Sequence, residues 1–447
     1  MTIFFFPHFD LIQFNLIVLF YFVLFCCWHA GVTPLVEQPL TISNSQFVNN
    51  LAASDGAGVA VMLASNYSVT NCLFRGNIAR LSGAGFFDGN GYATCRANIS
   101  LMIDSVFVNN SAQQVQICVC VCVFSRKGGG LFIRGCNTTV TNTTFRDNSA
   151  IGLGGSLMID AASGRTMLSQ LVVTNSQSGR HGGGIAITGG NVFLTNVTLM
   201  NNTASQNGGG LYVRGTQGWV LNVDLQNAVI DWNTASQGGG ASIESNVDFY
   251  NWTSKPEVKF TYVSIAHNKG ITNGGGISIQ NGALATSQCY FDSNQAKNGS
   301  GISYQSGWYQ DYQVPYFIFF LFCFCLIFFF LCFFQSRNKL TTYVYIVCSE
   351  KNAASEMGGG IYAAETSVGL NETKFARNSA KYGGAIYAAK CFIKESKNVN
   401  FSQNVAKFSG GAIQVPFNCS TWCVDCHYQV NEAPSGQDQS TGPAQMR

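Results

Sequence analysis

Hydrophobic and polar residues alternate over short distances along most of the chain. Residues 131–133, 185–187, 192–194 and 211–213 are typical: each is a short run of β-branched, aromatic or aliphatic residues among Gly, Asn, Ser and Thr. Runs of this kind, bounded by turn-forming residues, predict strands of about three to five residues. No stretch carries a convincing helical period, so the pattern predicts an all-β protein.

The strands belong to a repeated phrase. Each copy has an aromatic or aliphatic residue, two variable residues, Asn, a small pair ending in Ala and, after a short gap, glycines followed by an aliphatic residue. The first half begins at Phe107, Phe145, Ile230, Phe375 and Phe401. The glycine half begins at Gly128, Gly182, Gly208, Gly238, Gly274, Gly358 and Gly383, with degenerate copies near Gly56, Gly83, Gly154, Gly299 and Gly410.

Successive glycine clusters are mostly about 25 to 30 residues apart, which is the length of one solenoid coil. A leucine-rich repeat would need a leucine lattice, which is absent. We therefore predict a right-handed parallel β-helix of about 12 coils over residues 44–415, interrupted by apolar insertions.

Each repeated residue has an expected structural role. The apolar residue should point inward and stack on its counterpart one coil away, at a spacing of about 4.8 Å. The Asn falls where the chain must turn; identical amides can form a ladder, and Asn tolerates the left-handed conformation. The glycines serve another corner, where a positive φ or a close backbone approach excludes a side chain. The predicted structural residues are Asn110, Asn148, Asn233, Asn268, Asn294, Asn378 and Asn404, with Gly129, Gly183, Gly209, Gly239, Gly275 and Gly359.

The pairing of Phe-x-x-Asn with Gly-Gly-[Ala/Ile/Leu] resembles the repeat of the chlamydial polymorphic outer-membrane proteins. Similar repeats occur in large surface proteins of many microbes and protists. The resemblance covers roughly residues 44–415 and implies a β-helix of the pectin-lyase-like superfamily that acts as a surface-exposed, adhesin-like passenger. The chain departs from that family after Gly411, where nothing resembles the family's terminal membrane barrel, so autotransport is not expected.

Residues 1–30 are apolar and rich in Phe, and they predict a signal peptide or signal anchor. No Lys or Arg precedes the hydrophobic run, so a gene-model artefact is the alternative. Residues 113–127 form an apolar insertion within a repeat unit, since removing about a dozen residues there restores the period.

Residues 309–350 contain a second internal apolar tract. From Pro315 it runs uncharged for about 20 residues, the length of a membrane-spanning helix, and Arg337 and Lys339 follow it. One hypothesis is that both internal tracts are unspliced introns translated in frame. The other is a genuine transmembrane helix, which would separate half-solenoids 44–308 and 351–415 on opposite sides of a membrane.

The cysteines divide between the apolar tracts and the polar repeats. Pairing of those in the repeats would suit an oxidising compartment, and free buried thiols are the alternative. Residues 416–447 are expected to form a cap and tail in which disulfides among Cys419, Cys423 and Cys426 close the solenoid end. The stretch Cys423-Val-Asp-Cys426-His427 also matches a haem-attachment pattern, but few residues follow it, so no cofactor or metal is expected.

Asn-x-Ser/Thr sequons would be glycosylation sites in a eukaryotic secretory pathway. The alternative is that a chain rich in Asn and Thr produces them by chance. They lie at Asn66, Asn98, Asn109, Asn137, Asn142, Asn196, Asn201, Asn251, Asn298, Asn371, Asn400 and Asn418. Charged residues make up 11% of the chain, with a net charge of +3 and scattered Lys and Arg, so no nucleic-acid partner is expected.

Enzymes that cut polysaccharides also use this fold, and glycoside hydrolysis needs two carboxylates across the bond. Their typical Asn-x-Asp, Asp-Asp and Gly-His-Gly clusters are absent. The nearest approach is Arg180-His181-Gly182, interpreted as a turn before a glycine corner. Asp147, Asp231 and Asp292 occupy variable positions of the phrase and are interpreted as solvated surface.

We therefore expect a non-enzymatic repeat scaffold at the cell surface or secreted, with glycan or cell-surface and matrix ligands, and with membrane association if an apolar tract is an anchor. Alternatives are a polysaccharide-active lyase or hydrolase of the same fold and a fragment of a larger membrane-anchored surface protein.

Overall fold

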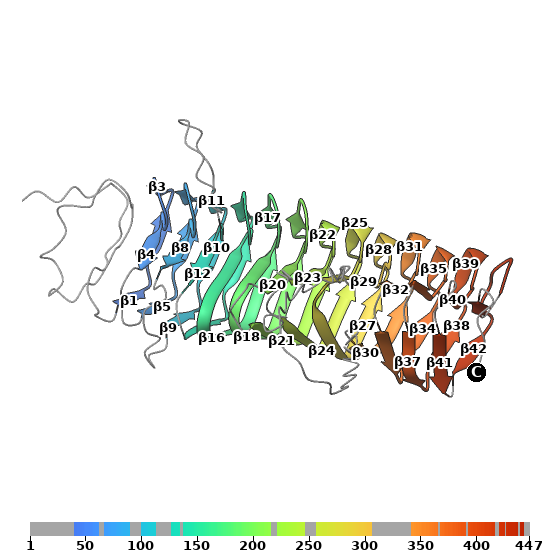
Figure 1. Ribbon diagram of the computed structural model, residues 1–447. Coiled ribbons are helices and arrows are strands. Elements are labelled where there is room, and N and C mark those ends of the chain that lie inside the picture. Colours follow the sequence, from blue (N-terminus) through green and yellow to red (C-terminus); the bar gives the residue numbers. More distant parts are fainter. Residues whose placement is uncertain are drawn as a thin grey trace, which may run out of the picture.

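The computed structural model describes residues 40–61, 67–89, 100–112, 127–134, 137–215, 221–245, 256–305, 341–364, 367–389, 392–415, 420–424, 426–436 and 439–441. These residues form strands and no helix. The pairings between strands are parallel, and the strands stack along one axis in chain order, from the blue N-terminal end to the red C-terminal end (Figure 1). The prediction of an all-β parallel solenoid is confirmed. The predicted signal segment, residues 1–30, lies outside the described residues.

The strands fall into stacks that recur in each turn of the chain. The post-glycine strands, which follow the glycine corner, are β4 (Val59–Val61), β8 (Phe86–Asp88), β12 (Leu131–Ile133), β16 (Leu157–Thr174), β18 (Ile185–Met200), β20 (Leu211–Gly215), β23 (Ala241–Ser245), β26 (Ile277–Gln280), β29 (Ile302–Gln305), β32 (Ile361–Ala364), β36 (Ile386–Ala389), β40 (Ile413–Val415) and β43 (Gln439–Thr441).

The pre-ladder strands come next along the chain, and β16 and β18 extend into this stack. They are β1 (Leu40–Ser43), β2 (Gln46–Val48), β5 (Tyr67–Thr70), β6 (Leu73–Arg75), β9 (Ser100–Ile103), β10 (Val106–Val108), β13 (Thr138–Thr141), β14 (Thr144–Arg146), β21 (Leu221–Asp231), β24 (Glu257–Ala266), β27 (Ala283–Asp292), β30 (Thr341–Glu350), β33 (Ser367–Asn371), β34 (Lys374–Ala376), β37 (Phe392–Lys397), β38 (Asn400–Ser402), β41 (Ser420–Val424) and β42 (His427–Gln429).

The ladder strands form a separate 12-stranded sheet directly after the repeated Asn. They are β3 (Leu51–Ala52), β7 (Ile78–Ala79), β11 (Ser111–Ala112), β15 (Ser149–Ala150), β17 (Gln177–Ser178), β19 (Thr203–Ala204), β22 (Thr234–Gln237), β25 (Lys269–Asn273), β28 (Gln295–Asn298), β31 (Ala353–Met357), β35 (Ser379–Tyr382) and β39 (Val405–Ser409).

Several strands are longer than the predicted three to five residues. For example, β18 has 16 residues and β21 has 11. One corner consists of a single residue with positive φ, such as Asn196 in β18, Asn227 in β21 and Tyr262 in β24. Because only one residue turns the chain, hydrogen bonding to the neighbouring coils continues on both sides of the corner.

The repeated aromatic residue points into the core and stacks between coils. The Phe107 ring lies 4.5 Å from that of Phe74 and 4.8 Å from that of Phe145, both nearly parallel to it. Phe375 and Phe401 stack at 5.2 Å. All five side chains are fully buried. Such stacks combine buried apolar area with favourable ring geometry, so they hold successive coils in register.

The repeated Asn residues form a buried hydrogen-bonded ladder. In each step the Nδ2 of one amide donates to the Oδ1 of the next, at 2.8 to 3.1 Å. All seven Asn residues predicted from the sequence lie in this ladder. It also contains Asn50, Asn77, Asn202, Asn352 and Asn431.

Amides inside the ladder are bonded at both ends, as Asn378 illustrates. Its Nδ2 donates to Asn404 Oδ1 at 3.0 Å and to the carbonyl oxygen of Ser349 at 2.9 Å. Its Oδ1 accepts from the backbone N–H of Asn352 at 3.1 Å and from Asn352 Nδ2 at 3.0 Å. A buried amide left unpaired would be costly, so this complete bonding makes a polar core column compatible with folding.

The left-handed residue of this corner is the one before the ladder Asn, and not the Asn itself as expected. Asn109 (φ 54), Asp147 (φ 56), Trp232 (φ 54), His267 (φ 50) and Gln403 (φ 55) are examples. The ladder Asn has to keep its side chain inward to bond both neighbouring coils. The turn therefore falls on the preceding residue, whose type varies between coils.

The ladder is broken at Ser176, which occupies the Asn position between Asn148 and Asn202. Its backbone N–H still donates to Asn202 Oδ1 at 3.0 Å. On the other side, Asn148 Nδ2 donates to Ser156 Oγ at 3.3 Å, and this hydroxyl lies 2.6 Å from Ser176 Oγ. Ser156 stands where neighbouring coils have their third glycine, so a second substitution compensates for the shorter side chain.

Both internal apolar tracts fall between described strands of the solenoid. Ala112 and Lys127 are separated by residues 113–126, whereas their partners in the next coil, Ala150 and Leu153, are separated by residues 151 and 152 alone. Lys127 itself, the last residue of the predicted insertion 113–127, bridges to Leu153 and so belongs to the coil.

The second tract is shorter than predicted, because residues 341–350 form β30. This strand pairs with β27, and Asn294 Nδ2 donates to Asn352 Oδ1 at 3.0 Å. The coils on the two sides of residues 306–340 are therefore in direct contact. This contact is incompatible with half-solenoids on opposite sides of a membrane. Residues 306–340 lie outside the described residues.

Paired coils also continue past residue 415, the predicted end of the repeats. Strand β42 pairs with β38, and β43 pairs with β40. Asn404 Nδ2 donates to Asn431 Oδ1 at 2.9 Å. Part of the predicted cap and tail, 416–447, is therefore a further coil of the same type.

Candidate functional site

The predicted glycines lie at the corner before the post-glycine strands. The first glycine of a triplet has the positive φ, for example Gly208 at +67°. The middle glycine is required for a different reason. A Cβ on Gly209 would lie 2.3 Å from the carbonyl oxygen of Gly239 and 2.6 Å from that of Thr234. Gly129, Gly183, Gly239, Gly275 and Gly359 have equally close backbone neighbours. These residues serve packing between coils.

The cysteines of the described repeats are mainly structural. Cys72 and Cys289 are free and buried, and each lies close to a backbone carbonyl, those of Thr70 and Ser287. Burial raises the pKa of both thiols. In the C-terminal coil Cys426 is disulfide-bonded. Cys423 lies in β41, whose side chains are not described, and Cys419 lies outside the described residues.

The sequon asparagines differ in exposure. Asn109, Asn142, Asn196, Asn201 and Asn400 are exposed; Asn137, Asn298 and Asn371 are half-buried; and Asn66, Asn98, Asn251 and Asn418 lie outside the described residues. Some amide nitrogens are engaged: Asn142 Nδ2 donates to Asp104 Oδ1 at 2.7 Å, and Asn298 Nδ2 donates to Asn273 Oδ1 at 3.0 Å. The exposed group includes the sequons that a transferase could reach.

A polar cluster lies on the outer face of the post-glycine strands; we call it the His181 cluster (His181, Asn207, Tyr212 and Glu244). The rings of His181 and Tyr212 stack at 4.5 Å. The hydroxyl of Tyr212 donates to Glu244 Oε2 at 2.8 Å, and Asn207 Nδ2 donates to Glu244 Oε1. Burial lowers the pKa of His181 and raises that of Tyr212. The buried Nδ1 of His181 has no hydrogen-bond partner among the described residues.

These contacts place His181 next to the glycine corner, where the sequence predicted a turn. A neighbouring carboxylate, Asp160, contacts Lys127 Nζ at 3.2 Å and accepts from Thr188 Oγ1 at 2.8 Å. Both carboxylates are therefore engaged by adjacent side chains. These bonds connect side chains from different coils on the outer face. Among the described residues, no group of three or more His, Cys, Asp or Glu side chains could hold a metal ion.

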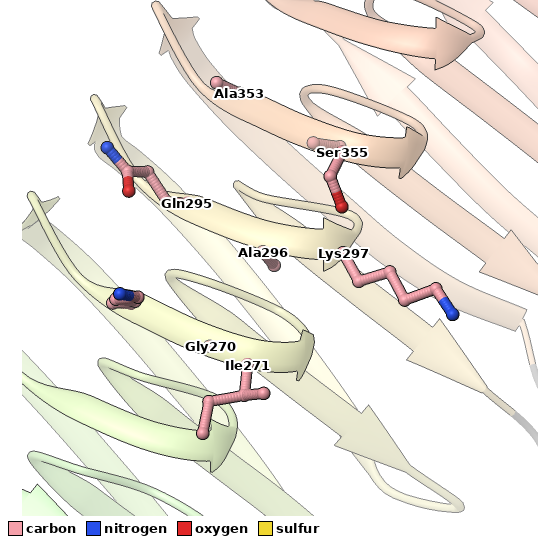
Figure 2. A pocket seen from close by; sticks show the side chains of 9 residues that line it. Gly270, Ile271, Gln295, Ala296, Lys297, Ala353 and Ser355 are labelled. Carbon is pink, nitrogen blue, oxygen red and sulfur yellow. The ribbon is translucent and has the colours of Figure 1, made fainter.

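A shallow concavity of about 500 Å³ lies on the ladder strands β25, β28 and β31. Its rim carries Lys269, Ile271 and Lys297, and its floor is formed by Gly270, Ala296 and Ala354. Figure 2 shows Gln295 and Lys297 projecting from the two ends of β28 and Ser355 projecting from β31, so that they do not converge on one point. The concavity therefore has the form of an open trough along the sheet.

The predicted surface carboxylates differ in environment. Asp147 is exposed and lies beside Arg146. Asp231 is more buried, and its Oδ1 lies 2.9 Å from His267 Nδ1. Asp292 has a buried Oδ1 without a hydrogen-bond partner in the described part of the chain. Asp231 and Asp292 are half-buried, so they are less solvated than the sequence analysis expected.

An exposed group of aromatic side chains lies beside these two carboxylates, and the sequence analysis did not single it out. Trp232 and Tyr262 are each 57% exposed, and the Trp232 ring stacks on that of His267 at 4.7 Å. Their position in the repeat could have identified them from the sequence. Both occupy left-handed corner positions where other coils have mainly Asn, Gln or charged residues.

None of the described residues forms a helix long and apolar enough to span a membrane, and the predicted span around residues 315–334 lies outside them. Comparison of the chain with protein-family models, curated proteins and solved structures found no match. Its function has to be inferred from its own residues and their geometry.

Proposed function

We propose that this protein is a non-enzymatic scaffold displayed at a cell surface or secreted, which presents its outer side chains to a glycan or matrix ligand. Its fold would be a right-handed parallel β-helix of about a dozen coils. Parallel strands in one sheet are almost always connected with this hand. The resemblance to the polymorphic outer-membrane repeat supports the same architecture.

The observation that carries the proposal is the contrast between inward and outward positions. In the ladder strands the inward residue is nearly always Ala or another small residue, as at Ala79, Ala204 and Ala380. The outward residue of the same strands changes from coil to coil: Leu51 pairs with Ile78, and at the equivalent position further along the stack Thr234 pairs with Lys269. A repeated core with a varied exterior is the organisation of a binding solenoid.

The two internal apolar tracts fit this proposal as additions to a continuous scaffold. The coils pair directly across both, so the scaffold does not need either tract to complete its hydrogen bonding. We favour their absence from the mature product through splicing. Sequencing the mature transcript across codons 113–127 and 309–350 tests this part, and retention of both tracts would contradict it.

The location is tested with the tagged full-length chain in a eukaryotic secretory host. The expected result is labelling of intact cells or recovery from the medium, together with a mass decrease on treatment with peptide N-glycosidase. Asn196 provides a matched control. Thr198→Ala should abolish occupancy at Asn196 while keeping the left-handed Asn at the corner (φ 56). Unglycosylated protein confined to the cytosol would refute the proposal.

A polysaccharide-active enzyme is the second candidate, and the residues to test for it are those of the His181 cluster, which joins a carboxylate, a phenol and an imidazole. The test is release of new reducing or unsaturated ends from pectin-like and alginate-like polymers. Activity that Glu244→Gln abolishes would replace the scaffold proposal with catalysis.

A further inference from the structure

The outer face of β21, β24 and β27 has a distinctive arrangement of side chains. Ser264, at its centre, pairs with Val229 on one side and Tyr290 on the other. Two residues further along β24, Ala266 pairs with Asp231 and Asp292 in the same way. Small side chains therefore occupy the middle strand, and larger or charged ones occupy both neighbours.

Aromatic side chains stand at the two ends of this middle strand. Tyr262 lies at the corner before Ser264 and is 57% exposed. His267 lies at the corner after Ala266, and Trp232 from the preceding coil stacks on it with an interplanar angle of 8°. We call Trp232, Tyr262, His267, Tyr290, Asp231 and Asp292 together the aromatic patch.

The fold does not require aromatic residues at these corners. Trp232 has φ 54 and Tyr262 has φ 56, a conformation that bulky residues rarely adopt. At the equivalent positions other coils have Gln403 and Gln288, with φ 55 and 52. A positive φ recurs at these corners from coil to coil, so the backbone conformation belongs to the fold and the side chain is what varies. An exposed Trp and an exposed Tyr placed this way on neighbouring coils therefore point to a ligand.

The polar groups of the patch limit what that ligand can be. Asp231 Oδ1 bonds His267, which fixes the ring that supports Trp232. Asp292 is half-buried, and its buried Oδ1 accepts no hydrogen bond from a described residue, so the coils do not use the full acceptor capacity of this carboxylate. The outward positions at the centre of the patch carry two carboxylates and neither Lys nor Arg. This distribution disfavours an anion.

We propose that the aromatic patch binds a neutral carbohydrate through its pyranose rings. A pyranose has an apolar C–H face, which stacks on the rings of Trp232 and Tyr262, and an edge of hydroxyl groups, which donate to carboxylates such as Asp292. Trp and Tyr are also the residues that most often dominate binding energy at interfaces. This inference rests on the proposed scaffold function and gives it a site and a ligand class.

One neighbouring feature has to be controlled. Asn201 is an exposed sequon residue and lies one coil before Trp232, since Met200 pairs with Asp231. A glycan on Asn201 would lie next to the patch. Thr203→Ala removes this sequon while leaving Asn201 at its corner, so binding is measured on the full chain carrying Thr203→Ala.

The test compares three glutamine variants in that background. Trp232→Gln and Tyr262→Gln insert the residue that other coils tolerate at these corners; Asn is avoided because it would create a new sequon at either position. The control is Val430→Gln, which changes an exposed residue with φ 52 several coils away. Thermal unfolding of each variant is measured alongside, and no variant is expected to unfold at a lower temperature.

The probes are six-unit β-1,4-linked oligosaccharides of glucose, xylose, mannose and N-acetylglucosamine, with oligogalacturonate as the anionic comparison, in titration calorimetry. We expect binding of at least one neutral probe, a loss of at least about tenfold in Trp232→Gln and in Tyr262→Gln, and no change in Val430→Gln. Retained affinity in both patch variants, tighter binding of oligogalacturonate, or no binding of any neutral probe would each overturn the assignment. A lowered unfolding temperature in both patch variants would show that the aromatic residues serve the fold instead. None of these results bears on surface localisation, so the scaffold proposal fails or stands separately.

Discussion

The break in the amide ladder gives the sharpest test of how this solenoid is stabilised. Ser156→Gly alone removes the hydroxyl that contacts Asn148 Nδ2 and Ser176 Oγ, and leaving such buried groups unpaired costs about 1–3 kcal/mol. Ser176→Asn alone places an amide against Ser156. The neighbouring coil shows the resulting crowding, because Gly184 is the counterpart of Ser156 and a Cβ there would lie only 3.2 Å from Asn202 Nδ2. We expect this crowding to cost about 1–3 kcal/mol.

The double variant Ser156→Gly with Ser176→Asn restores the regular coil. Its new amide can bond Asn148 and Asn202, so the double variant should be within about 1 kcal/mol of the wild type, with an interaction energy of about 2–3 kcal/mol between the two sites. Because a solenoid opens locally, the assay is hydrogen exchange of the amides at residues 148–149 and 176–177, with thermal unfolding alongside. Additive losses in the double variant would refute this account of the break.

Three further predictions concern the packing and the connections. Gly209→Val should destabilise the protein by more than about 3 kcal/mol in thermal unfolding, because its Cβ would meet the backbone of the next coil. The control Gln206→Thr should change stability by less than about 0.5 kcal/mol. Equal effects of the two changes would contradict the close-approach argument. Burial raises the pKa of the Cys72 and Cys289 thiols, so alkylation at pH 8 should be slow until the protein unfolds, and their contribution to stability should be lost only as the pH rises above the ordinary thiol value of 9.0; rapid labelling of the native protein would argue against buried thiols. Replacing residues 306–340 by a two-residue connection should leave circular dichroism and the unfolding temperature unchanged, and loss of folding would show that the tract is part of the scaffold.

The repeat predicts the inward positions well because they obey the same constraint in every coil. Phe107, Phe145 and Phe375 are buried as expected, and the predicted Asn residues share one ladder. Five ladder members were missed. Ser349 precedes Asn352, so that copy lacks the apolar residue of the motif. The other four, Asn50, Asn77, Asn202 and Asn431, do follow an apolar residue. Hydrogen bonding, and not the aromatic residue, defines the position.

The outward features could not be predicted from the phrase. The contact between Trp232 and His267 depends on which corners lie next to each other. Because successive coils differ in length, the ladder Asn residues being 31 and 35 residues apart, the sequence alone does not show which corners align. The sequence analysis also expected the ladder Asn to adopt the left-handed conformation of the turn. Its hydrogen bonds to the two neighbouring coils override this local preference. The burial of Asp292 Oδ1 cannot be read from the sequence around it.

The direct pairing of coils across residues 306–340 has a consequence for how such a gene can change. Contacts between coils fix the strand register, so the register does not depend on the length of a connection. Additional codons that enter the reading frame at such a connection would escape the quality control that removes misfolded chains. Repeat genes of this type can therefore accumulate and test new segments at their corners, and the scaffold supplies ready positions for grafting a foreign peptide or domain.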